Sequence, residues 1–215
     1  MNYIIIPIKS FKNSKNRLKI KLRDDIRINL CLFMAMDVLN VVSKNKDFEK
    51  IVIITREKGA FSKFENEKIN ILMDNDELGI NQAILTVYKN YNINEKDSVL
   101  ILHSDIPSIT PEDLDLIVKK ANSSNKIAIL VPSEKKDGTN AVYIKPANLM
   151  DFQFGKNSYE KHLEQLKKVK NIDLFVLENK NLSLDIDTYE DLIKFIERKT
   201  KTLSQNYLSK IKIKN

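Results

Sequence analysis

Apolar residues along this chain gather in short runs, and the longer stretches between the runs carry apolar residues at helical spacing. The runs predict β-strands at residues 2–8, 50–55, 69–73, 98–103, 126–131, 140–145 and 172–177. IAILV is apolar at every position and SVLIL at every position after its serine, which is typical of strands covered on both faces. The pattern therefore predicts a buried and mostly parallel sheet.

Helical patterns fill the intervals between these runs. Residues 24–43 carry an apolar stripe at helical spacing. In TPEDLDLIVKKA, Thr110 is the expected N-cap, with proline at the first helical position and an acid three residues after the cap. Residues 187–198 repeat this pattern, with Asp187 or Thr188 as the cap. Alternating strands and helices predict a three-layer α/β domain that binds ligands at the carboxyl ends of its strands.

The length of 215 residues suits one large domain or one domain with an appendage. We expect a domain at residues 1–197, followed at 198–215 by a basic tail or a docking helix. No apolar run approaches the ~20 residues that span a bilayer, and no secretory signal is evident. The single cysteine, Cys31, lies in an apolar pattern and is expected in the core. These features predict a cytoplasmic protein.

The formal net charge of +7 is unevenly distributed. Residues 198–215 hold six basic and no acidic side chains, and residues 1–27 hold eight basic and two acidic ones. The rest of the chain is slightly acidic. Two local basic regions do not form the broad basic face that follows a nucleic-acid backbone. Nucleic acid is therefore not the expected partner.

The first basic region begins with the stretch IPIKSFKNSKNRL, directly after the first predicted strand. It contains Lys9, Lys12, Lys15 and Arg17 and no glycine. Loops that hold phosphates usually need glycine, so that backbone N–H groups can approach the anion. Lysine and arginine side chains can neutralise a triphosphate without such a cradle. This loop is either a side-chain phosphate site or a solvated turn.

Two acidic segments are candidates for a metal site. Asp105, in HSDIPSITPEDL, follows the strand at 98–103, and Asp185 and Asp187 alternate in LSLDIDTYEDL. Residues two apart in an extended chain point the same way, and Mg²⁺ takes a few carboxylates together with phosphate oxygens. An Asx-turn and a helix cap are the structural alternatives. His103 lies next to the first segment and is more simply a half-buried histidine.

Two further stretches, KKDGTNAVYI and FGKNSYEKH, each place a glycine before hydroxyl and amide side chains. Thr139 follows the first glycine, and Ser158 follows Gly155 and opens a predicted helix, whose N-terminus favours a phosphate or carboxylate. A hairpin turn and a simple N-cap are the alternatives. His162 lies one helical turn after Ser158 and faces either the same anion or solvent.

Several catalytic signatures are missing from the sequence. It has no serine–histidine–acid order, C-x-x-C, H-E-x-x-H or G-x-x-x-x-G-K-[ST] motif. Hydrolases with such nucleophiles, zinc enzymes and P-loop ATPases are therefore disfavoured.

Taken in order, these segments resemble the 2-phospho-L-lactate guanylyltransferases of coenzyme F-420 biosynthesis. The matching stretches are IPIKSFKNSKNRL, MAMDVL, LGINQAI, SDIPSITPEDL, DGTNAVYIKP, FGKNSYEKH and LDIDTYEDL, and they span residues 1 to about 197. The resemblance implies a single GT-A-like, Rossmann-like nucleotidyltransferase domain. It also implies transfer of GMP from GTP to a phosphorylated C3 acid with release of pyrophosphate. Archaeal relatives use 2-phospho-L-lactate, and some bacterial relatives use phosphoenolpyruvate or 3-phosphoglycerate.

The resemblance also implies roles for individual residues. Thr139, Gly155 and Ser158 match positions that hold the phospho-acid, Lys15 and Arg17 match the phosphate loop, Asp105 and Asp187 match the metal-binding acids, and Asn81 lies near the nucleotide. Charge and position lead us to add Lys9 and Lys12 to the nucleotide site and Asp185 to the metal site. Mg²⁺ is the expected cofactor, and Lys15, Arg17 and Asp105 are the expected catalytic residues.

The expected chemistry needs no general base, because the second pKa of a phosphate monoester is about 6 and the attacking oxygen is already anionic near neutral pH. Two alternatives remain at this level. One is a nucleotide- or nucleic-acid-binding module, and the other is a cytidylyl- or molybdopterin-type nucleotidyltransferase of the same fold. The general prevalence of dimers favours a homodimer, and no membrane partner is expected.

Overall fold

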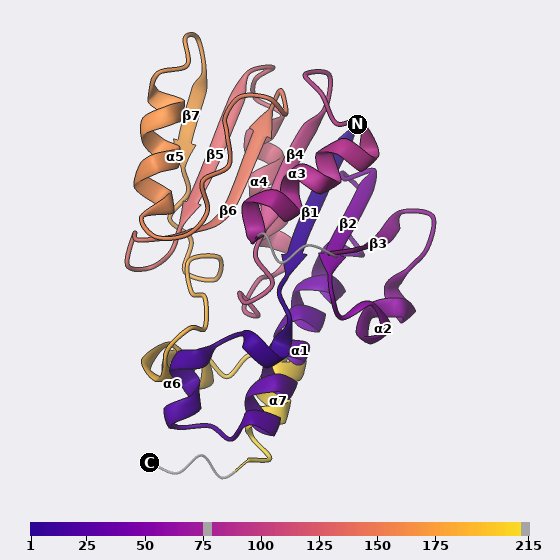
Figure 1. The fold of residues 1–215 in the computed structure, drawn as a ribbon. Helices are drawn as coiled ribbons and strands as arrows, with labels where there is room; N and C mark the ends of the chain where they lie inside the picture. Colours follow the sequence, from indigo (N-terminus) through magenta and orange to yellow (C-terminus); the bar gives the residue numbers. More distant parts are fainter. Residues whose placement is uncertain (75–78, 212–215) are drawn as a thin grey trace.

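The computed structural model describes residues 1–74 and 79–211. Within this part of the chain, helices cover both faces of a seven-stranded sheet (Figure 1). The strands are β1 (Asn2–Ile8), β2 (Lys50–Thr55), β3 (Ile69–Met73), β4 (Ser98–Leu102), β5 (Ile127–Pro132), β6 (Thr139–Lys145) and β7 (Asp173–Val176). All the predicted strands form, each within one residue of its predicted bounds, and the three-layer α/β class is confirmed.

The helices predicted at 24–43, after Thr110, from Ser158 and at 187–198 all form, and the structure has further helices that were not predicted individually. The helices are α1 (Asp24–Val42), α2 (Lys58–Phe61), α3 (Ile80–Tyr91), α4 (Pro111–Ala121), α5 (Ser158–Lys167), α6 (Tyr189–Glu197) and α7 (Leu203–Leu208), with 3-10 turns at Phe11–Asn13, Asn16–Ile20 and Ser62–Phe64. Thr110 and Thr188 begin α4 and α6 with reciprocal capping boxes. In each box the threonine hydroxyl accepts from the third helical N–H, and the aspartate there accepts from the threonine N–H. Thr188, and not Asp187, is the cap of α6.

The strand order is β3-β2-β1-β4-β6-β5-β7. All neighbouring strands are parallel except β6, which is antiparallel to both β4 and β5. Leu102, the last residue of β4, therefore pairs with Ala141 near the start of β6. This reversal brings Thr139 to the edge where the parallel strands end, which is the ligand edge of such sheets.

The sheet is buried on both faces, which explains its uninterrupted apolar runs. In β1, Ile4 and Ile6 pack with α1 and α4 on one face, whereas Tyr3 and Ile5 pack with α3 and α5 on the other. Successive side chains alternate between the faces of a strand, so both sets must be apolar when helices cover both faces.

The loop that follows β1 is held in place by Arg27 of α1. This side chain is only 1% exposed. Its guanidinium donates to the carbonyl oxygens of Phe11 (2.9 Å), Lys12 (3.0 Å) and Ser14, and pairs with Asp24 at 3.0 Å. A buried arginine thus fixes a loop that contains no glycine. In Figure 1 this loop, in indigo, lies beside α6 and α7 at the carboxyl end of β1.

The tail after α6 turns back onto the domain. The Asp37 carboxylate of α1 accepts from the N–H groups of Leu203 (2.7 Å) and Ser204 (2.9 Å), and Leu208 joins the core. Residues 203–208 therefore form a docking helix, while the boundary at residue 197 stays a prediction. Leu78 of the LGINQAI stretch and Lys212 and Lys214 of the tail lie outside the described residues. Among the described helices, none is long and apolar enough to cross a bilayer.

Candidate active site

A cavity of about 770 Å³ opens at the carboxyl edge of the sheet. Its walls come from the loop after β1, the loop after β4, the turn before β6, the loop before α5 and the extended segment before α6. The predicted site residues that line it are Lys9, Lys15, Arg17, Asp105, Thr139, Gly155, Ser158, Asp185 and Asp187. The fold thus gathers nearly all the predicted residues in one place.

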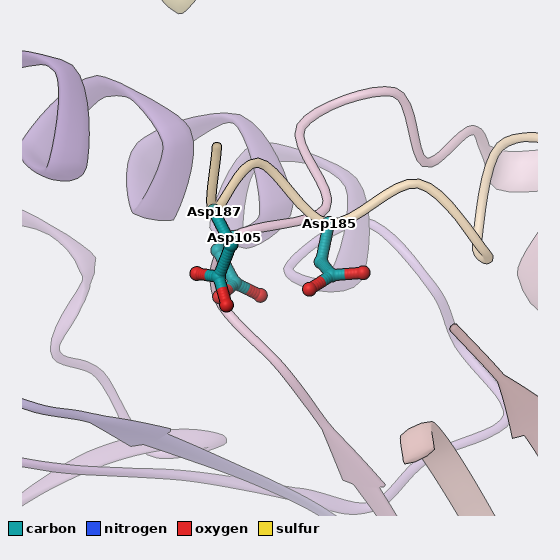
Figure 2. Close-up of side chains that lie close together, drawn as sticks. All are labelled: Asp105, Asp185 and Asp187. Carbon is teal, nitrogen blue, oxygen red and sulfur yellow. The ribbon is translucent and has the colours of Figure 1, made fainter. Parts of the chain in front are cut away.

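Three carboxylates form one wall of this cavity (Figure 2). One oxygen each of Asp105, Asp185 and Asp187 lies within 4.8 Å of the others. Asp185 and Asp187 point the same way because Leu184 and Ile186, which alternate with them, are buried in the core. The Ile186 N–H donates to the Asp105 carbonyl at 3.1 Å. This bond fastens the segment before α6 to the loop after β4 and so brings the acids together.

Lys15 lies against two of these acids. Its ammonium donates to Asp105 at 2.5 Å and also to Asp187. Burial lowers the pKa of Lys15, but the two carboxylates outweigh burial and hold this pKa above its usual value. Burial likewise raises the pKa of Asp105, but Lys15 and His103 outweigh it, so the pKa of this carboxyl lies below its usual value. Both groups are therefore charged near neutral pH.

Asp185 has a different electrostatic environment. Burial, followed by repulsion from Asp105, raises the pKa of Asp185 to about 7. The buried Asn140 amide donates to one Asp185 oxygen at 3.1 Å and to the Leu182 carbonyl at 3.0 Å. This carboxyl is thus poised between its neutral and charged forms, and added positive charge nearby would favour the charged form.

The donor set of this wall fits a divalent cation. Oδ1 of Asp105 is buried and accepts no hydrogen bond from any described residue. Mg²⁺ is held by carboxylate oxygens together with water and phosphate oxygens. Asp105, Asp185 and Asp187 could supply such a set, which supports the predicted metal site.

Hydroxyl groups line another part of the cavity, here called the hydroxyl wall. The Thr139 N–H donates to Ser158 Oγ at 3.0 Å, and both residues line the cavity and are almost fully buried. Ser158 is the first residue of α5; Asn157, with φ of 57°, occupies the cap position, so the simple N-cap interpretation of Ser158 is wrong. Gly155 has φ of 123°, which favours glycine. Hydroxyls and a helix N-terminus together favour an anion here.

His162 faces neither solvent nor the open cavity. It is fully buried, its Nε2 accepts the Gln153 N–H at 2.9 Å, and its Nδ1 lies 3.0 Å from Thr139 Oγ1. His103 lines the cavity and packs on Phe154 with ring centroids 5.2 Å apart. Of the two histidines, only His103 therefore contacts the cavity, and His162 lies behind Thr139.

Two predicted nucleotide residues do not line the cavity. Asn81 donates to the Phe154 carbonyl at 3.1 Å and accepts the Phe154 N–H at 2.8 Å. These two bonds fix the loop backbone just before Gly155. Lys12 is exposed outside the cavity. Direct contact of either residue with a nucleotide stays a prediction.

Sequence reasoning missed two residues that shape the site. Asn140 orients Asp185, and its place in the GTN stretch was a usable signal. Arg27 holds the loop that carries Lys15, but no local pattern distinguishes it from the other basic residues around it.

A second cavity of about 290 Å³ adjoins the first. It lies beyond the carboxyl ends of β1, β2 and β3, and Lys9, Asn13 and Ile80 line both cavities. Asp74 and Arg56 also line it. Asp105, Asp185, Asp187, Thr139 and Ser158 line the larger cavity and not the smaller one.

Comparison with known sequences agrees with this geometry. A family model described as guanylyl transferase CofC like matches residues 2–215. A 2-phospho-L-lactate guanylyltransferase from Methanobrevibacter smithii is 30% identical over 211 residues, covering 98% of this chain and 91% of that protein. The protein of that description from Methanocaldococcus jannaschii is 31% identical, covering 98% and 89%. A phosphoenolpyruvate guanylyltransferase from Conexibacter woesei is 27% identical, covering 88% and 85%.

Solved structures show the same fold. A Desulfovibrio desulfuricans protein assigned as a nucleotide-diphospho-sugar transferase superposes with a TM-score of 0.78 at 14% identity, covering 97% of this chain and 94% of that one. A nucleotidyl transferase from Methanothermobacter gives 0.62 at 12% identity, covering 98% and 99%. These likenesses concern architecture, whereas the family match and the relatives at 30% identity span nearly the whole chain. The chain therefore belongs to the guanylyl transferase CofC-like family.

Proposed function

We propose that this protein is a guanylyltransferase that transfers GMP from GTP to 2-phospho-L-lactate, as in coenzyme F-420 biosynthesis. The products are lactyl-2-diphosphoguanosine and pyrophosphate. One observation carries the proposal: Lys15 and the three clustered acids line the same cavity as Thr139 and Ser158. A triphosphate and an anionic acceptor need binding groups in one shared cavity, and the names of the relatives support this pair of substrates.

The reaction is an in-line displacement at the α-phosphorus of GTP. A phosphate oxygen of the acid forms a bond to this phosphorus, the bond to the β-phosphate oxygen breaks, and pyrophosphate leaves. The attacking oxygen is already anionic near pH 7, so no general base is required. Lys15, Arg17 and Lys9 line the cavity, where they neutralise charge on the transferring and leaving groups.

Mg²⁺ is part of the proposal. Asp105 and Asp187 would hold it, with Asp185 as a third ligand that becomes charged in its presence. The bound ion supplies positive charge to the triphosphate and to the departing pyrophosphate. The chain contributes the fixed position of these carboxylates, through the bond between Ile186 and Asp105.

The smaller cavity is the proposed nucleobase site. Guanine presents its N1–H and 2-amino donors side by side, and a carboxylate accepts both. Asp74 lines this cavity, and its N–H donates to the Thr55 carbonyl at 3.0 Å, which fixes its backbone at the end of β2. Adenine presents an acceptor at N1, so the same carboxylate would disfavour ATP.

The identity of the acceptor acid is a further part of the proposal. Phosphoenolpyruvate and 3-phosphoglycerate share a phosphate and a carboxylate with 2-phospho-L-lactate, and one relative is named for phosphoenolpyruvate. Several relatives that are 30–31% identical to this chain carry the 2-phospho-L-lactate name, which favours that acid. A cytoplasmic location and a homodimer stay predictions.

Pyrophosphate release tests the proposal directly. The purified protein is supplied with GTP, Mg²⁺ and each of the three acids in turn, and then with ATP, CTP and UTP in place of GTP. Release should require GTP, Mg²⁺ and an acid together, and should be fastest with 2-phospho-L-lactate. Release with CTP instead would identify another nucleotidyltransferase of this fold. Salt-sensitive binding to RNA without pyrophosphate release would favour a binding module.

A further inference from the structure

His162 of α5 determines which way the Thr139 hydroxyl donates its hydrogen bond. His162 Nε2 accepts the Gln153 N–H at 2.9 Å, so this nitrogen carries no hydrogen. A neutral imidazole then carries its hydrogen on Nδ1. Nδ1 lies 3.0 Å from Thr139 Oγ1, so Nδ1 is the donor and the threonine oxygen is the acceptor.

His162 is neutral under working conditions. Burial, followed by the charges of His103 and Lys161, lowers the pKa of His162 to about 4. The ring is also fixed in orientation, because Phe154 packs edge-on against it with centroids 4.9 Å apart. Both nitrogens therefore keep the roles described above.

In these roles the hydroxyl hydrogens of Thr139 and Ser158 both stay free to bond to a ligand. Thr139 Oγ1 accepts from His162, and Ser158 Oγ accepts from the Thr139 N–H at 3.0 Å. No described residue accepts a hydrogen bond from either hydroxyl, and both residues line the cavity. Two hydroxyl donors beside a helix N-terminus suit an oxyanion.

We propose that His162 is a positioning residue for the acid substrate: it donates to Thr139 Oγ1 and so commits the Thr139 hydroxyl to donate into the cavity. The ligand is an oxygen of the phospho-acid, so the inference rests on the proposed function. His162 itself does not touch the substrate. It acts through Thr139, and its position one helical turn after Ser158 lets a single face of α5 organise both hydroxyls.

Two amide substitutions separate the two hydrogen bonds of His162. In His162→Asn the side-chain amide reaches the place of Nδ1 and can still donate to Thr139, but it loses the bond to Gln153. In His162→Gln the amide reaches the place of Nε2 and can still accept from Gln153, but it loses the donor to Thr139. A matched control is Leu166→Ala, which removes a buried side chain from the same helix without touching Thr139.

The measurement is the KM for 2-phospho-L-lactate and the KM for GTP in each variant, with the unfolding midpoint recorded alongside. His162→Gln should raise the KM for the acid about tenfold or more, since a hydrogen bond to a charged group is lost, and leave the KM for GTP within about twofold. His162→Asn should keep the KM for the acid near that of the natural protein, although it lowers the unfolding midpoint. In a Thr139→Val background, His162→Gln should have no further effect on the KM for the acid.

Equal rises in the acid KM for His162→Gln, His162→Asn and Leu166→Ala would show a purely structural role and overturn the inference. An unchanged acid KM in His162→Gln would do the same. If the natural protein releases no pyrophosphate with any of the three acids, the proposed function fails and this inference with it. If the natural protein is active and the KM for the acid is unchanged in His162→Gln, this inference is overturned while the proposed function stands.

Discussion

The Lys15 ammonium lies 2.5 Å from the Asp105 carboxylate, although the two residues are 90 positions apart in the sequence. The same ammonium pairs with Asp187, so one cation lies between two acids that could also hold a metal ion. The ammonium and a divalent cation would compete here, because Lys15 occupies Asp105 Oδ2 and Asp187 Oδ1, while Asp105 Oδ1 has no partner among the described residues. If the proposed metal ion binds these carboxylates, we expect Lys15 to shift away from them.

Replacing Lys15 should remove activity. In Lys15→Met the charge that offsets the triphosphate is lost, and we expect kcat to fall by about a hundredfold or more. Lys19→Met is the matched control, because Lys19 is exposed in the same loop. Steady-state pyrophosphate release measures both variants. A Lys15→Met variant with the kcat of the natural protein would remove Lys15 from the site.

The same substitution predicts a metal-dependent stability. Without Lys15 the three neighbouring carboxylates repel one another, so Lys15→Met should have a lower Tm than the natural protein in EDTA. Mg²⁺ or Mn²⁺ should then raise the Tm of Lys15→Met by more than it raises the Tm of the natural protein, since no ammonium competes with the ion. Thermal unfolding with and without metal measures the effect. Equal metal-induced shifts in the two proteins would argue against a shared position.

Asp185 should make the metal-free protein less stable as pH rises. Its folded pKa of about 7 lies above the unfolded value of about 4, so the folded state binds the extra proton between these values. The stabilisation that protonated Asp185 gives to the folded state is fully present below pH 4 and is lost as pH rises through about 7. Over this range the free energy of unfolding falls by up to about 1.4 kcal/mol per pH unit. Asp185→Asn should flatten this part of the profile, whereas Asp115→Asn, on the exposed face of α4, should not. Urea unfolding at a series of pH values, in EDTA, would reveal whether the two profiles differ.

Arg27 should be essential for the loop that carries Lys15. Arg27→Met leaves the carbonyl oxygens of Phe11, Lys12 and Ser14 without their donor, and we expect a loss of about 3 kcal/mol or more in the free energy of unfolding. The KM for GTP should rise as well, because the loop is no longer fixed. The exposed Arg23, in Arg23→Met, is the control. Urea unfolding and GTP kinetics measure the two effects, and a stable variant with normal kinetics would contradict this account of the loop.

Asp74 should select the nucleobase. Asp74→Ala should raise the KM for GTP about tenfold or more and reduce the preference for GTP over ATP, while the KM for the acid stays unchanged. Competition between the two nucleotides in the pyrophosphate assay gives the preference. A variant that retains its preference for GTP would place the guanine contact elsewhere.

Much of the fold was predictable because its determinants are local. The strands of the sheet follow from apolar runs. The starts of α4 and α6 follow from a threonine with an aspartate three residues later. The start of α5 was harder, since Ser158 has the chemistry of a cap but lies one residue inside the helix. Its hydroxyl oxygen accepts the N–H of Thr139 in β6. No local sequence pattern reveals this partner.

The candidate site divides in the same way. The acids, the basic loop and the hydroxyl residues were recognisable by type and by their place after strands, and the ordered set of motifs indicated the family. Their combination into one cavity depends on the antiparallel β6, which carries Thr139 to the ligand edge, and on Arg27, which shapes the loop from behind.

The sequence by itself determined the strands, the helices, most of the residues of the site and the family, because these depend on side-chain type and on spacing over a few residues. The tertiary structure alone decided that Lys15 lies between Asp105 and Asp187, that Asp185 is poised near neutral pH, and that His162 donates to Thr139. Charge pairing, burial and hydrogen-bond direction depend on groups that are far apart in the chain. They become defined only when the sheet order and the packing of its loops are set.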